Sequence, residues 1–117
     1  MKKIISICIL LLMLSACGDR KFETIDTNRA VELINENAII IDVREVEEYN
    51  REHIPNAINI PLSEIDTISY NKNDTIIVYC QSGMRSLEAV KILADMGYTS
   101  LYNLDGGLLN WGGSLEE

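Results

Sequence analysis

The chain has 117 residues, enough for one compact domain, and its 18 acidic and 10 basic side chains give a formal net charge of −8 at pH 7. No cluster of lysine and arginine follows Lys3. Because binding to nucleic acid depends on clustered cations that neutralise phosphates, the sequence argues against a nucleic-acid partner.

The first sixteen residues have the features of a signal peptide. Lys2 and Lys3 give a positively charged start, and the apolar run from Ile4 to Leu14 that follows is shorter than a comfortable membrane span. We therefore expect residues 1–16 to be removed and not to join the fold. Loss of the two lysines would change the formal charge from −8 to −10.

The tetrapeptide Leu14-Ser15-Ala16-Cys17 resembles the bacterial lipoprotein box. The resemblance implies cleavage before Cys17 and acyl chains on that cysteine, which anchor a protein by burying methylenes at about 0.8 kcal/mol each. Residues 17–21 would be the lipidated N-terminus and a short tether. The domain would then lie in the cell envelope, outside the cytoplasm, and in the periplasm if the cell is Gram-negative. The alternative is an ordinary secretory signal that ends beside a cysteine by chance.

Strand and helix patterns alternate along residues 22–117, which we expect to form one domain. In chain order the sequence predicts an edge strand at 22–25, a helix capped by Thr27 and reaching Ile34, a strand at 38–43, a helix at 45–51, a strand at 57–60, a helical turn at 64–68 capped by Ser63, a strand at 75–79, a helix at 86–96 ended by Gly97, a strand at 100–104, and a short helix with Trp111 after Gly106.

The two strongest strand signals are the continuous apolar runs AIIIDV and TIIVY, which are typical of strands buried on both faces. Residues 86–96 instead carry their apolar side chains on one side, as an amphipathic helix does. Regular alternation of strands and helices predicts an α/β fold, in which a small central parallel sheet is flanked by helices on both faces. A complete set of elements favours a monomer.

Only one of the three cysteines remains available for chemistry. Cys8 lies in the leader and Cys17 would carry the lipid, which leaves Cys80 as the single free thiol. An intradomain disulfide is therefore excluded. One cysteine and one histidine at this separation cannot build a zinc site, so no metal and no cofactor are expected.

Cys80 lies where the strand at 75–79 ends, and sites in open parallel sheets form beyond the carboxyl ends of the strands. Gly83 permits a tight backbone path that can turn N–H groups inward as an anion nest. The start of the next helix and Arg85 add positive charge on the same side. These surroundings favour a reactive thiolate. The alternative is a cysteine packed as a small apolar core residue.

Three segments resemble the rhodanese family, over residues 22 to about 113. CQSGMRS resembles the family's active-site loop, and NLDGGLLNW resembles its closing motif, with Gly106, Gly107 and Trp111. IIDVREVEEYNREHIPNAINIP resembles its upstream segment, with matching positions at Asp42, Arg44, Glu48, Tyr49, His53, Ile54, Pro55, Ala57 and Pro61. Two positions depart from the family pattern: Glu52 stands where glycine is common, and Val46 where proline is frequent. These departures concern the conformation of residues 46–53.

The resemblance implies a sulfurtransferase in which Cys80 takes a sulfane sulfur from thiosulfate or a similar donor and passes it, as a persulfide, to a thiol or protein acceptor. Arg85 would hold the anionic donor through its side chain. The neighbouring loop residues would bind it mainly through backbone N–H groups; they are Gln81, Ser82, Gly83, Met84 and Ser86. The motif residues with structural roles are Asp42, Arg44 and His53. Trp111 is expected in the core.

Two other functions remain in view. A cysteine-type phosphatase also pairs a cysteine with an arginine, but its loop places five residues between them and this chain has four, Gln81 to Met84. A docking module or an envelope persulfide carrier would share the fold yet turn over small donors poorly.

Overall fold

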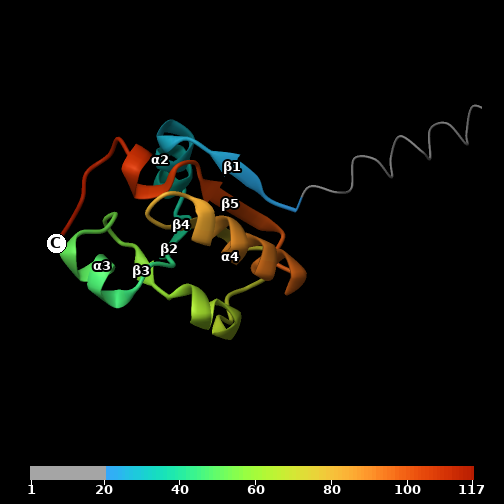
Figure 1. Ribbon diagram of the computed structural model, residues 1–117. Helices are drawn as coiled ribbons and strands as arrows, with labels where there is room; N and C mark the ends of the chain where they lie inside the picture. Colours follow the sequence, from blue (N-terminus) through green and yellow to red (C-terminus); the bar gives the residue numbers. More distant parts are fainter. Residues whose placement is uncertain (1–20) are drawn as a thin grey trace, which may run out of the picture.

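The computed structural model describes residues 21–117 (Figure 1). The predicted signal peptide and the predicted lipid site at Cys17 lie outside the described residues. Within residues 21–117, no helix combines the length and the apolar character that crossing a membrane requires.

All predicted elements are present. In chain order they are β1 (Glu23–Ile25), α2 (Thr27–Asn35), β2 (Ile39–Asp42), α3 (Val46–Arg51), β3 (Ile58–Asn59), the 3₁₀ helix η1 (Leu62–Thr67), β4 (Thr75–Tyr79), α4 (Met84–Asp95), β5 (Ser100–Leu104) and the 3₁₀ helix η2 (Gly107–Asn110).

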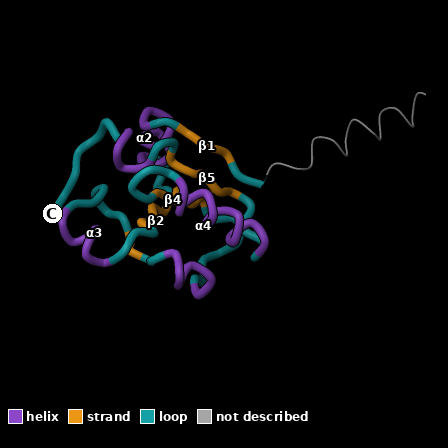
Figure 2. The backbone as a smooth tube through the Cα atoms, in the orientation of Figure 1, coloured by secondary structure: helices purple, strands orange, loops and turns teal. Residues whose placement is uncertain are grey.

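The five strands form one parallel sheet in the order β1-β5-β4-β2-β3 (Figure 2). The central strand β4 pairs with both neighbours, so that Ile76 lies between Ile39 of β2 and Leu101 of β5. Because successive side chains of a strand point to opposite faces, β4 contributes to two cores. Ile76 and Val78 belong to one core, whereas Ile77 and Tyr79 belong to the other.

Helices cover both faces of this sheet. The first core contains Leu93 of α4 and Ile65 of η1, and the second contains Leu33 of α2 and Leu108 of η2. The predicted α/β fold, with a central parallel sheet between helices, is therefore confirmed. Cys80 belongs to the first core, at the carboxyl end of β4.

Several element boundaries differ from the predictions for local reasons. Asp26, not Thr27, caps α2, because its carboxylate accepts the Arg29 N–H at 2.9 Å. The Thr27 hydroxyl instead donates to the Asn110 carbonyl at 3.3 Å and so ties α2 to η2. The helical turn predicted at 64–68 is a 3₁₀ helix that begins at Leu62, directly after Pro61, and ends at Thr67, so Ser63 lies inside it and does not cap it.

The helix α4 begins at Met84, two residues before the predicted start at Ser86. Gly83 precedes it in the left-handed region, with φ 103°, and its carbonyl accepts the Leu87 N–H at 3.3 Å. At the other end Gly97, also left-handed with φ 100°, follows the last turn as predicted.

The segment with the two departures from the family pattern adopts an unstrained conformation. A capping box joins Glu45 and Glu48 at the start of α3, and Val46 occupies the exposed first helical position. Glu52 ends α3 with φ −167° and ψ 150°, an extended conformation that any residue adopts. Neither position therefore requires the family's usual residue.

Candidate active site

The Cys80 sulfur is surrounded by hydrogen-bonding groups of the loop that follows β4. The side chain is fully buried, and Sγ accepts the backbone N–H of Gly83 at 3.0 Å and that of Ser86 at 3.4 Å. Sγ also lies 3.4 Å from Ser86 Oγ, which donates to the Gly83 carbonyl at 3.2 Å. When the thiol ionises, this hydroxyl can turn its proton to the sulfur. The loop thus offers the sulfur three donors.

These hydrogen bonds decide the ionisation of Cys80. Burial is the largest single influence and raises the pKa of the thiol, since it disfavours the charged form. The opposing influences are the hydrogen bonds from the Ser86 side chain and from the backbone of Ser86, Gly83 and Ser82. Together they outweigh burial, so the pKa of Cys80 lies below its ordinary value. These surroundings suit a reactive thiolate better than an inert core cysteine.

The closing motif, residues 103–111, holds the active-site loop through backbone hydrogen bonds. The Leu108 N–H donates to the Cys80 carbonyl at 2.8 Å, and the Leu109 N–H donates to the Gln81 carbonyl at 3.1 Å. This approach requires glycine at Gly107, which has φ 61°, because a Cβ there would collide with the Cys80 carbonyl oxygen. The first residues of η2 therefore fix the start of the loop.

A second contact between glycines completes this support. Gly83 and Gly106 lie against each other, such that a Cβ on Gly83 would come within 3.3 Å of the Gly106 backbone nitrogen. A glycine of the closing motif thus packs directly against the active-site loop, although the two segments are far apart in the sequence.

Arg44 connects the loop to the rest of the site. Its guanidinium and the Asp42 carboxylate form a fully buried ion pair, with Nη2 to Oδ2 at 2.8 Å and Nε to both carboxylate oxygens at 3.1 Å. Nη1 donates to Gln81 Oε1 at 3.1 Å, and Nη2 donates to the Glu52 carbonyl at 2.7 Å. The Gln81 side chain therefore anchors the loop to Arg44, a contact that the sequence analysis did not foresee, whereas donor binding through the Gln81 backbone N–H stays a prediction.

Arg85 is held by a residue that the sequence analysis did not place in the site. Its Nη1 and Nη2 donate to the two carboxylate oxygens of Glu48 at 2.8 Å and 3.1 Å. The hydrogen bond from Arg85 is the main reason that the pKa of Glu48 falls to about 2. The same hydrogen bond is the main reason that the pKa of Arg85 is raised, and the electrostatic effect of Cys80 adds a smaller contribution. Glu48 is one of the motif positions that carried the family resemblance, and this match was the only feature of the sequence that could have pointed to its place in the site.

The chain matches the model of the family described as the Rhodanese-like domain over residues 26–114. The chain belongs to this family.

Named relatives agree with that assignment. PspE of Escherichia coli strain K12, named a thiosulfate sulfurtransferase, is 49% identical over 70 residues, which are 56% of this chain and 67% of PspE. YrkF of Bacillus subtilis strain 168 is 38% identical over 84 residues, which are 70% of this chain, and only 45% of YrkF is covered. A solved structure, "rhodanese with anions from E. coli", has a TM-score of 0.62 at 43% identity and covers 68% of this chain and 98% of its own.

The motif residues of this rhodanese-like domain separate into those at Cys80 and those that build the frame. Gly83 and Ser86 contact the sulfur, Gln81 directly follows Cys80 in the loop, Arg85 lies in the first turn of α4, and Ser82 is exposed. The Met84 side chain is 80% exposed and points away from the core. Trp111 is only half-buried against the second core, with its Nε1 donating to the Ser114 carbonyl at 3.0 Å.

His53 belongs to the frame. Its ring stacks on Tyr49 with the ring centroids 3.8 Å apart, and Nδ1 lies 2.9 Å from the Tyr49 carbonyl oxygen. Its backbone exchanges two hydrogen bonds of 2.8 Å with Glu116. All these contacts join α3 to the C-terminal segment, which suits the structural role that the family resemblance implied.

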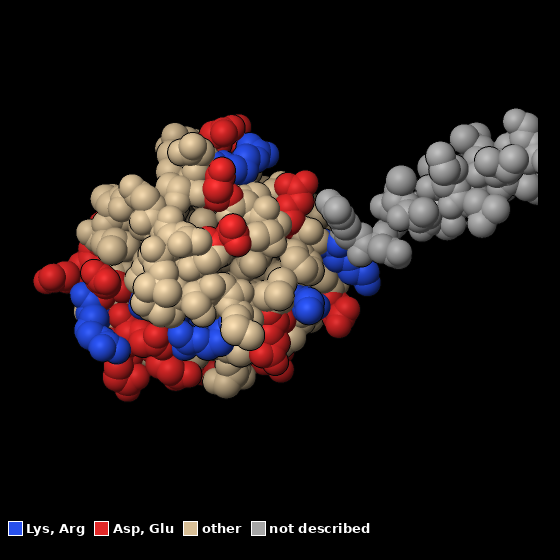
Figure 3. Space-filling view, turned by 45° about the horizontal axis from the view of Figure 1, so that its top comes forward, with Lys and Arg blue, Asp and Glu red and all other residues tan. Residues whose placement is uncertain are grey.

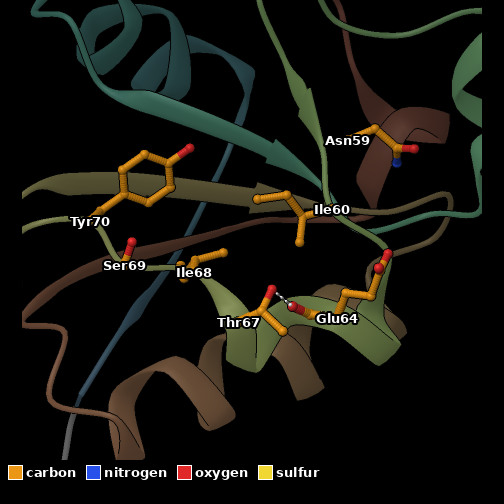
Figure 4. Close-up of a pocket in the computed structure, with 7 residues that line it drawn as sticks. All are labelled: Asn59, Ile60, Glu64, Thr67, Ile68, Ser69 and Tyr70. Carbon is orange, nitrogen blue, oxygen red and sulfur yellow. Dashed lines mark hydrogen bonds between the residues drawn. The ribbon is translucent and has the colours of Figure 1, made fainter.

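Another hollow, of about 450 Å³, lies between η1 and the end of β3 (Figure 4). Tyr70, Ile68 and Ile60 line it together with a few polar side chains, and Thr67 bonds within the wall to the Glu64 carbonyl. Its lining includes no cysteine, lysine or arginine, so it offers neither a thiol nor a cation to an anionic sulfur donor.

Replacing Arg44 is expected to destabilise the fold strongly. In Arg44→Ala the Asp42 carboxylate remains buried without its partner, which typically costs about 3–5 kcal/mol. Urea unfolding followed by circular dichroism measures the loss. Arg29→Ala is the matched control, because its ion pair with Glu32 is exposed and such pairs contribute about 0–1 kcal/mol. Equal stability changes in the two variants would contradict the central position of Arg44.

The pH dependence of Cys80 alkylation tests the hydrogen bonds to its sulfur. Because the pKa of Cys80 lies below the ordinary thiol value of 9.0, the rate with iodoacetamide should reach half its maximum below that pH. Ser86→Ala removes one donor and should move the midpoint upward. Ser69→Ala, in the η1 hollow, is the control and should leave it unchanged. An unshifted midpoint in Ser86→Ala would contradict the assigned role of the hydroxyl.

Proposed function

We propose that the protein is a sulfurtransferase that moves a sulfane sulfur from thiosulfate or a similar donor to a thiophilic acceptor through a persulfide on Cys80. The observation that carries the proposal is the buried Cys80 sulfur, which accepts the N–H groups of Gly83 and Ser86 and has a lowered pKa. Membership of the rhodanese-like family and the similarity to PspE support it.

In the first half-reaction the Cys80 thiolate attacks the outer sulfur of thiosulfate. A new S–S bond forms to Cys80 while the S–S bond of the donor breaks, and its electron pair leaves with sulfite. The persulfide carries the negative charge that remains. Loop N–H groups, already ordered in a buried setting, stabilise that charge without reorganising.

Arg85 holds the donor in this scheme. Glu48 occupies two of the five N–H donors of the guanidinium and leaves the others for an anion. The ion pair also fixes the side chain, which lowers the entropic cost of binding. In the second half-reaction an acceptor thiolate attacks the outer sulfur of the persulfide, and the Cys80 thiolate is regenerated.

A persulfide carrier is the second candidate. Met84 is 80% exposed and Leu109, whose N–H bonds to the loop, is 69% exposed, so apolar side chains flank the loop where a protein acceptor would approach. A carrier would form the persulfide on Cys80 but would turn over thiosulfate slowly.

The proposed location is the cell envelope, with the domain outside the cytoplasm and a lipid on Cys17 as the membrane anchor. The leader sequence of residues 1–16 and the tetrapeptide that ends at Cys17 support this proposal. The proposed oligomeric state is a monomer.

Replacing the nucleophile tests the proposal directly. Cys80→Ser should abolish transfer of sulfur from thiosulfate to cyanide, because the hydroxyl cannot form a persulfide under these conditions. Mass spectrometry should detect the gain of one sulfur atom in the wild type and none in the variant. The thermal unfolding of both proteins serves as the control for folding. Full activity in Cys80→Ser would refute the assignment.

Two neighbouring residues in the first turn of α4 should differ sharply in their effect on thiosulfate turnover. Arg85→Ala removes a charge-assisted contact worth about 1.5–3 kcal/mol, so kcat/KM should fall by roughly 10- to 100-fold. Met84→Ala alters an exposed side chain and should change kcat/KM by less than about twofold. Steady-state kinetics at fixed ionic strength measure both. An equal loss in Met84→Ala would mean that the Met84 side chain contributes to donor binding.

A further inference from the structure

A hollow of about 330 Å³ lies beside the active-site loop. It is lined by Arg44, Glu48, Arg51, Glu52 and Gln81. Gln81 directly follows the nucleophile, and Glu48 holds Arg85. A molecule in this hollow therefore lies next to Gln81, the neighbour of Cys80, and next to Glu48, the partner of Arg85.

The charges that line the hollow cancel. Two of the lining residues carry a guanidinium group and two carry a carboxylate, and these four groups differ in the ion pairs that they form. Arg44 is neutralised by buried Asp42, and Glu48 is paired with Arg85. Within residues 21–117 the Glu52 carboxylate takes part in no ion pair, and Arg51 donates only to the Glu47 carbonyl, at 3.4 Å. Removal of the Glu52 charge would leave the lining with a net charge of +1.

The exposed surface around the hollow is also rich in carboxylates. At the left end of the molecule, where Figure 1 places α3, Figure 3 shows acidic side chains interleaved with basic ones. The exposed acidic residues of this segment are Glu45, Glu47 and Glu52. A dianion that approaches Cys80 from this side gains less than the presence of Arg51 and Arg85 alone would suggest.

We propose that Glu52 is a specificity-determining residue, which weakens the hold of the site on small dianions and favours sulfane donors without net negative charge. An organic persulfide with a nearby ammonium group is such a donor. The inference rests on the proposed function, because the donor reacts with the same Cys80 thiolate. That thiolate attacks the terminal sulfur of R–S–SH, the donor S–S bond breaks with its electron pair on R–S⁻, and Cys80–S–SH forms.

The Glu52 charge can be removed without disturbing the frame. Arg44 bonds to the Glu52 backbone carbonyl and not to its carboxylate, so the 2.7 Å contact survives substitution of the side chain. The extended backbone, with φ −167°, accepts any residue, and the side chain is exposed. Glu52→Gln and Glu52→Gly are therefore expected to fold as the wild type does.

The kinetic test uses the purified full chain with two donors, thiosulfate and the persulfide of cysteamine. At low ionic strength Glu52→Gln and Glu52→Gly should lower KM for thiosulfate about 3- to 10-fold with kcat unchanged, and should lower the preference for cysteamine persulfide. The effect should vanish at about 0.5 M salt, where charges more than about 4 Å apart are screened. Glu47→Gln, an identical charge change on α3 outside the hollow, is the control and should have less than half the effect.

A second readout does not depend on sulfur transfer. The rate of Cys80 alkylation by anionic iodoacetate, divided by that by neutral iodoacetamide, reports the electrostatic potential at the thiolate. The ratio should rise several-fold in both Glu52 variants and little in Glu47→Gln. An unchanged ratio in the Glu52 variants, or an equal rise in Glu47→Gln, would overturn the role of Glu52. If the wild type transfers no sulfur from either donor, the proposed function fails, while the alkylation ratio still decides the electrostatic role of Glu52.

Discussion

The buried guanidinium of Arg44 is the point on which the arrangement of the site depends. It joins three segments that are separate in the chain: the end of β2 through Asp42, the end of α3 through the Glu52 carbonyl, and the active-site loop through Gln81. A buried ion pair adds little net stability, because desolvation of both charges offsets their attraction. Its contribution here is geometric, since a planar group with five donors admits few alternative arrangements of its partners.

The loop itself is held by backbone contacts on its outer side and uses backbone donors on its inner side. The carbonyl groups of Cys80 and Gln81 bond outward to η2, while the N–H groups of Gly83 and Ser86 point to the sulfur. This division resolves a conflict between burial and charge. A thiolate in an apolar core would be unfavourable. Here the burial that disfavours the charge also shields the N–H donors from water, and each hydrogen bond to the sulfur is stronger as a result.

The sequence predicted every helix and strand, because continuous apolar runs and the amphipathic pattern of α4 are local signals that the parallel sheet reinforces. It missed helix boundaries that a single residue determines, as Asp26 does for the start of α2 and Gly83 does for the start of α4. It also missed the side-chain roles of Gln81 and Glu48. Each depends on a partner 37 positions away, and neither spacing nor composition indicates which carboxylate meets which guanidinium. The positions of Cys80 and Arg85 followed from the strand–loop–helix order. The neutral hollow near them could be recognised only in the folded structure, because its lining residues come from separate segments of the chain.

The two ends of the described chain lie on different sides of the molecule with respect to Cys80. Lys21 lies with residues 97–100, at the amino ends of the strands, whereas Glu116 pairs with His53 beside α3 (Figure 1). A tag, bead or surface attached before residue 21 would therefore leave the mouth of the site facing outward. The same attachment after residue 117 would crowd α3 and compete with partners for the approach to Cys80.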